Sequence, residues 1–119
     1  GALKHTHHAA PGPEHPGADT ARLKAAGADP VILTPAGETP GAARARLPAE
    51  LDLVVAEGFK TAAWPKLWVH RADAGLEPPA PESPAVIAVA GDMPPDWDSP
   101  AVALEDLDGL IALLPLPCP

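Results

Sequence analysis

Proline is the feature that most constrains the fold of this chain, because 18 of its 119 residues are prolines spread along most of its length. Proline lacks a backbone N–H and interrupts helices, so helices must be short and turns frequent. Between the prolines, apolar runs of strand length alternate with short helical patterns. This alternation predicts an α/β fold with a mostly parallel sheet and flanking helices. At this length we expect one domain, residues 1–119, with a modest core.

The predicted elements are short and separated by Pro/Gly-rich loops. Residues 52–57 and 86–90 are continuous apolar runs, typical of strands covered on both faces, whereas residues 66–71 alternate as a peripheral strand does. Loops are expected at residues 8–17 and 76–84. The remaining predicted elements are strands at 2–4, 31–34 and 102–104, helices at 19–26 and 105–114, and a loop at 35–49 that contains one helical turn around 42–47.

Charge and cysteine content restrict the partners and the compartment. The formal net charge of −8 argues against a general nucleic-acid surface. The single cysteine, Cys118, permits no internal disulfide, so a reducing cytoplasm is the expected compartment. No apolar run reaches the length of a membrane span, and no leader pattern is visible, so no membrane is expected as a partner.

Two apolar strands end in a carboxylate beside a glycine, Glu57 before Gly58 and Asp92 after Gly91. Ligands of open α/β sheets bind at the carboxyl ends of strands, and an acid there is suited to the Mg²⁺ of a nucleotide. Glu57 is therefore either a magnesium ligand or the polar start of a loop. Gly58 favours the first interpretation, since it permits close backbone approach, as does the phosphate-neutralising charge of Lys60.

The block Lys4-His5-Thr6-His7-His8 is the densest group of polar side chains in the chain. On a strand, His5 and His7 share one face. Three interpretations remain open: a polar strand end around phosphate or Mg²⁺, a solvated cluster without function, and a zinc site completed by other histidines such as His15 or His70. Asp92 is likewise either a contact to a guanine ring or a plain loop aspartate.

The blocks Lys4-His5-Thr6-His7-His8 and Glu57-Gly58-Phe59-Lys60, with residues 16–28, 65–71 and 86–92 in the same order, resemble the MobB family. That family comprises GTP-binding, P-loop NTPase-like proteins of molybdopterin-guanine dinucleotide synthesis. By position, the resemblance implies a site for GTP and Mg²⁺ lined by the two blocks, with Glu57 at the metal. It also implies Asp92 as a possible base contact.

The chain departs from the family pattern at its beginning. The opening strand and the GxxxxGK[ST] phosphate loop do not occur in it, so we expect an N-terminally truncated, P-loop-less domain. Ala9 and Ala18 replace an acid and a lysine that are usual in the family. Residues 35–51 are also short for the family's helical connection.

The resemblance implies an accessory role, in which a GTP-binding protein assists the guanylyltransferase that attaches GMP to molybdopterin. A homodimer is expected, with at most weak GTPase activity, because no nucleophile and base pair is evident and no catalytic residue is assigned. Two alternatives stay open: a degenerate, nucleotide-free adaptor of the same pathway, and a metal-binding protein built on the histidine cluster.

Overall fold

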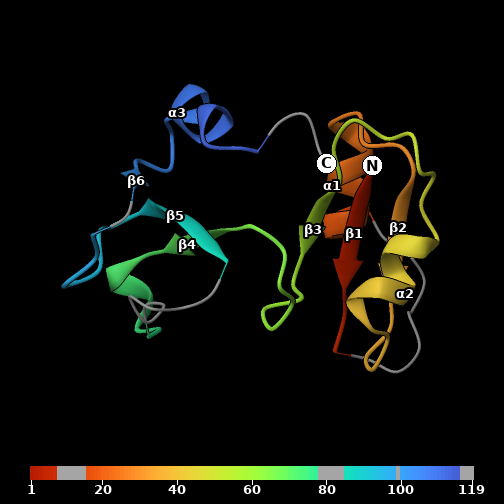
Figure 1. Cartoon of the computed structure of the whole chain (residues 1–119), viewed down its shortest axis with the longest axis horizontal. Helices are drawn as coiled ribbons and strands as arrows, with labels where there is room; N and C mark the ends of the chain where they lie inside the picture. The colour runs from red at the N-terminus through yellow and green to blue at the C-terminus, as the bar shows by residue number, and fades with distance from the viewer. Residues whose placement is uncertain (8–15, 78–84, 99, 116–119) are drawn as a thin grey trace. The chain divides into compact units, whose positions relative to one another are not determined.

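The computed structural model describes residues 1–7, 16–77, 85–98 and 100–115 of the chain, coloured in Figure 1. The chain divides into two compact units. Among the described residues, the first unit is Gly1–Ala62 and the second is Ala63–Pro115. In these ranges, none of the helices has the length and apolarity needed to cross a bilayer.

The first unit contains a three-stranded parallel sheet in the order β2-β1-β3 (Figure 1). Parallel neighbours need a crossover connection, and each crossover here carries a short helix. The central strand supplies Ala2 and Leu3, both fully buried, to the core. The elements are β1 (Ala2–His5), α1 (Asp19–Ala25), β2 (Val31–Thr34), α2 (Pro40–Ala45) and β3 (Val55–Glu57).

The second unit contains another three-stranded parallel sheet, in the order β4-β5-β6. Its central strand, β5, buries Ala88, Val89 and Ala90, which explains the continuous apolar run in the sequence. The elements are β4 (Lys66–His70), the 3₁₀ helix η1 (Ala72–Ala74), β5 (Val86–Gly91), β6 (Ala101–Val102) and α3 (Leu107–Ala112).

The predicted α/β class is confirmed, since every strand pairing described is parallel and helices flank both sheets. Strand boundaries at residues 31–34 are as predicted, and those of β1, β4 and β5 differ by one residue. The strands are, however, divided between two sheets. Strand β6 covers 101–102 instead of 102–104.

The interpretation of residues 52–57 as a strand covered on both faces was wrong. Only Val55–Glu57 form β3, and Val55 is 49% exposed. The central position of this sheet belongs to β1, so β3 lies at an edge and pairs on one side with β1. An apolar run does not distinguish a central strand from an edge strand when the strand order is unknown.

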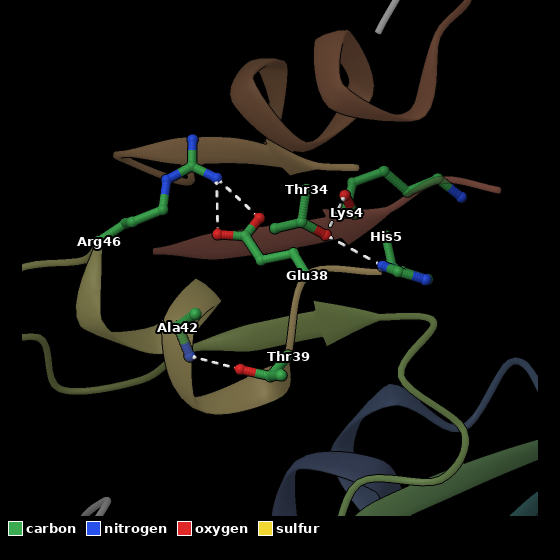
Figure 2. A network of polar contacts seen from close by, with 7 residues as sticks. All are labelled: Lys4, His5, Thr34, Glu38, Thr39, Ala42 and Arg46. Atoms are coloured by element: carbon green, nitrogen blue, oxygen red, sulfur yellow. Dashed lines mark hydrogen bonds and ion pairs between the residues drawn. The ribbon is translucent and has the colours of Figure 1, made fainter. Parts of the chain in front are cut away.

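The two later helices begin where a polar side chain caps them. Thr39 accepts a hydrogen bond from the backbone N–H of Ala42 at 3.2 Å, so α2 starts at Pro40, inside the predicted loop and two residues before its expected helical turn (Figure 2). Asp106 accepts from the N–H of Gly109 at 2.9 Å, so α3 starts two residues late. Most of the loops predicted at 8–17 and 76–84 lie outside the described residues.

Candidate functional site

Three strand ends meet at one edge of the first unit. His5, Thr34 and Glu57 are the last residues of β1, β2 and β3, whose parallel directions bring their carboxyl ends to the same edge. The register pairs His5 with Thr34 and Lys4 with Glu57. We call this the carboxyl edge of the first sheet, and it is the position at which open α/β sheets bind ligands.

Lys4 is the centre of a charged cluster at this edge. Its ammonium lies 2.5 Å from Oε1 of Glu57 and 2.8 Å from Oδ2 of Asp19, which α1 supplies from its first turn. The Lys4 side chain is 22% exposed, so water screens this cluster less than a fully solvated pair. We call Lys4, Asp19 and Glu57 the charged triad.

The contacts within the charged triad alter the pKa values of Lys4 and Asp19. Burial lowers the pKa of Lys4, but the hydrogen bonds and charges of Asp19 and Glu57 together outweigh it, so the pKa lies above its usual value. The hydrogen bond from Lys4, followed by its charge, holds the pKa of Asp19 below its usual value. One lysine and two carboxylates give the triad a formal net charge of −1.

The next residue on β1, His5, belongs to a second hydrogen-bond network, separate from the charged triad. Figure 2 shows Nδ1 of His5 beside the hydroxyl of Thr34, at 3.3 Å. The same hydroxyl donates to the backbone carbonyl of Lys4 at 3.2 Å. Thr34 is fully buried, so its hydroxyl depends on these partners instead of bulk water.

The turn after β3 packs directly against His5. Gly58 has a φ of +92°, and a Cβ at this position would lie only 2.8 Å from Cβ of His5. The turn then places Phe59, 7% exposed, with its ring centroid 4.7 Å from that of His5. Gly58 thus has both a conformational and a packing reason to be glycine.

The remaining residues of the two predicted blocks extend from this edge. Thr6 donates its backbone N–H to the carbonyl of Thr34 at 3.0 Å. His7 is exposed, with its ring edge-on to His5 at 6.0 Å between centroids. Lys60 is exposed, and His8 lies outside the described residues. The structure thus brings Lys4 to His7 and Glu57 to Phe59 together.

Asp92 belongs to the second unit, where it stabilises a turn. Its Oδ2 accepts from the backbone N–H of Ala72 at 2.8 Å, and its own N–H donates to the carbonyl of His70 at 3.0 Å. Gly91 makes this approach possible, because a Cβ there would clash with the His70 carbonyl oxygen. Asp92 therefore anchors the start of η1.

The side chains at the carboxyl edge are suited to a hydrated magnesium ion better than to a closed metal site. Among residues 1–7, 16–77, 85–98 and 100–115, no three His, Cys, Asp or Glu side chains are grouped to hold a metal. Asp19 and Glu57 nevertheless direct carboxylate oxygens at one cationic group, the ammonium of Lys4. Mg²⁺ needs only one or two carboxylates when water and phosphate complete its shell. This donor set fits such an ion.

Sequence reasoning did not assign two residues of this edge to the site. In the sequence, Asp19 is typical of the start of a helix and Thr34 of the end of a strand, and both descriptions are correct. Their positions held the signal, because both sit at element ends that a parallel sheet brings to its carboxyl edge. The sequence does not give the order of the strands in the sheet, and this order places β2, and therefore Thr34, next to β1.

The comparison with family models identifies the relatives of this chain. The model described as MobB, Molybdopterin guanine dinucleotide synthesis protein B, matches residues 1–92, which include the whole carboxyl edge of the first sheet and end at Asp92. No curated protein and no solved structure matches. The match covers well over half of the 119 residues. The chain therefore belongs to the MobB family, a nucleotide-binding family of molybdenum cofactor biosynthesis.

Proposed function

We propose that this chain binds GTP with Mg²⁺ at the carboxyl edge of the first sheet and assists the attachment of GMP to molybdopterin. The observation that carries the proposal is the charged triad, which gathers a lysine and two carboxylates where three parallel strands end. Membership of a nucleotide-binding family supports the same assignment.

The net charge of the triad dictates how the nucleotide would bind. A triphosphate is strongly anionic, and the two carboxylates of the triad repel it, so a cation that offsets these carboxylates would favour its binding. One Mg²⁺ would change the formal charge of the triad from −1 to +1, with Glu57 as its protein ligand and Lys4 directed at the phosphates. GTP binding is therefore expected to depend on Mg²⁺.

The other residues of the two blocks would surround the nucleotide. His5, Thr6, His7 and His8 follow Lys4 along the edge, and Gly58, Phe59 and Lys60 follow Glu57. As the family resemblance implies, Asp92 is proposed as a contact to the guanine ring.

An accessory role suits this set of residues. Among the described residues of the edge, the hydroxyl that lies beside an imidazole is that of Thr34, which is fully buried and donates to the Lys4 carbonyl, so it is not available as a nucleophile. Any GTP hydrolysis by this chain is therefore expected to be slow. We propose the molybdopterin guanylyltransferase as its partner, a homodimer as its working form and the cytoplasm as its location.

A thermal-unfolding comparison tests this function. The chain is heated with GTP·Mg²⁺, with ATP·Mg²⁺ and without nucleotide. Ligand at about a hundred times its dissociation constant adds about 2.7 kcal/mol of stability, which such a scan resolves. We expect a rise in Tm with GTP·Mg²⁺, a smaller one with ATP·Mg²⁺, and none with GTP plus EDTA. Cooperative unfolding with the same Tm in all samples would contradict the proposal.

Substitution of Glu57 tests its place at the metal. In Glu57→Ala, the triad loses a negative charge and its proposed Mg²⁺ ligand. The factor by which Mg²⁺ raises the affinity for GTP should therefore fall at least tenfold. Calorimetry at several Mg²⁺ concentrations measures this factor. Glu50→Ala, which removes an exposed carboxylate of the same unit outside the edge, is the matched control. If Glu57→Ala keeps the Mg²⁺ dependence of the unaltered chain, Glu57 is not a ligand.

A second candidate function, a nucleotide-free adaptor, is favoured by one observation. Lys4 already has two carboxylate partners, so the triad is satisfied without any ligand. An adaptor would bind the guanylyltransferase equally well with and without GTP. Measuring that affinity under both conditions separates the two candidates.

A further inference from the structure

We propose that Thr34 is a positioning residue, which holds His5 in the tautomer protonated at Nδ1 and thereby presents Nε2 of His5 as a hydrogen-bond acceptor. The inference deepens the proposed function. It rests on that function only for the identity of the group that donates a hydrogen bond to Nε2 of His5. The arrangement of Thr34, His5 and the Lys4 carbonyl is a property of the chain itself.

The hydrogen bonds allow one distribution of protons. The carbonyl of Lys4 can only accept, so the contact of 3.2 Å requires the Thr34 hydroxyl to donate its single proton there. The Thr34 oxygen then has only lone pairs left for Nδ1 of His5, at 3.3 Å. Nδ1 must therefore carry the proton, and in a neutral imidazole Nε2 is then the acceptor.

The surroundings fix the orientation of the ring as well as its protonation. The ring of Phe59 lies against His5 with 4.7 Å between the ring centroids. The backbone of Gly58 packs so closely on His5 that a Cβ on Gly58 would lie 2.8 Å from the His5 Cβ. Thr34 is fully buried and cannot exchange its partners for water. Figure 2 shows the second ring nitrogen of His5 pointing away from Thr34.

This assignment specifies what neutral His5 recognises. A phosphate oxygen offers no proton, so neutral His5 does not bind it through Nε2. A water molecule of a hydrated Mg²⁺ does offer one, and the proposed function supplies that donor at the same edge. We therefore assign to His5 the orientation of metal-bound water instead of direct phosphate binding.

The tautomer is measured directly by long-range ¹H–¹⁵N correlation spectra of the histidine side chains at about pH 8, where an ordinary imidazole is neutral. His5→Gln identifies the His5 signals. We expect the pattern of an Nδ1–H imidazole in the unaltered chain and in Thr34→Ser, which keeps the hydroxyl. In Thr34→Val, which keeps the shape but not the hydroxyl, we expect the Nε2–H pattern that free histidine prefers.

An Nε2–H pattern for His5 in the unaltered chain overturns the inference, whatever the variants do. So does an Nδ1–H pattern that survives in a folded Thr34→Val. GTP·Mg²⁺ titrations add an independent readout: Thr34→Val should bind about fivefold more weakly, the loss of one neutral hydrogen bond, and Thr34→Ser nearly normally. If the tautomers are as expected but no variant binds GTP, the proposed function fails while the role of Thr34 stands.

Discussion

At the residue scale, Lys4 determines the electrostatics of the carboxyl edge. Stability from the Asp19 contact is present above the unfolded pKa of about 3.9 and is lost as the pH falls through the lower folded pKa. Stability from Lys4 is present below about 10.4 and is lost as the pH rises through the higher folded pKa. In Lys4→Met, the urea midpoint of unfolding should therefore fall less than in the unaltered chain, both when the pH is lowered below about 3.9 and when it is raised above about 10.4.

The control for this substitution is Lys60→Met, which removes an exposed ammonium outside the charged triad. It should keep the acidic and alkaline losses of the unaltered chain. A profile of Lys4→Met that matches the unaltered chain would mean that the triad does not form in solution.

A glycine at this edge can be tested separately for strain and for crowding. Gly58→Ala places a Cβ 2.8 Å from that of His5 and forces alanine to a φ of +92°. Gly27→Ala has comparable strain at a φ of +97°, but nothing lies within 4 Å. Both should lower the free energy of unfolding by about 1–3 kcal/mol in urea titrations, with Gly58→Ala the larger. Equal losses would mean that the turn moves away from His5.

At the element scale, the caps set where the short helices begin. Thr39→Ala removes the acceptor of the Ala42 N–H and should destabilise the chain by about 0.5–2 kcal/mol in urea unfolding. Thr39→Ser keeps the acceptor and should stay close to the unaltered chain. A similar loss in both variants would attribute the effect to the threonine methyl group instead of the cap.

The sequence predicted elements well where local chemistry determines them. Pro30 and Pro35 bracket β2, and Gly27, at a φ of +97°, follows the end of α1. The sequence predicted the length and the burial of β3 poorly, because the number of strands that pair with a given strand depends on residues far away in the chain. For the same reason, the sequence did not predict that Thr34 belongs to the candidate site, because its hydrogen bond with His5 joins positions 29 residues apart.

At the scale of the whole molecule, the family match extends across both units, from residue 1 to residue 92. Hydrogen exchange with and without GTP·Mg²⁺ can locate the ligand along this range. We expect added protection at the amides of β1 and of the turn after β3. If Asp92 contacts guanine, the amides at Gly91 and Asp92 should also gain protection with GTP and not with ATP. Protection confined to the second unit would contradict the proposed site.

The sequence placed most of the candidate site, because the ends of parallel strands can be listed before their order is known. It could not show that one lysine would bind both carboxylates, since that depends on α1 reaching the same edge as β3. It also could not anticipate the separate hydrogen bonding of Asp92, which arises from the close approach of Gly91 to the His70 carbonyl.

The last two residues of β1 serve opposite faces of the sheet. Lys4 meets carboxylates, and His5 meets Thr34 and Phe59. Side chains alternate along a strand, so inserting or deleting one residue within β1 would exchange these environments. An ammonium would then lie against a hydroxyl and an aromatic ring, and an imidazole between two carboxylates. The length of β1 is therefore constrained in this family member, because it decides which environment Lys4 and His5 each enter.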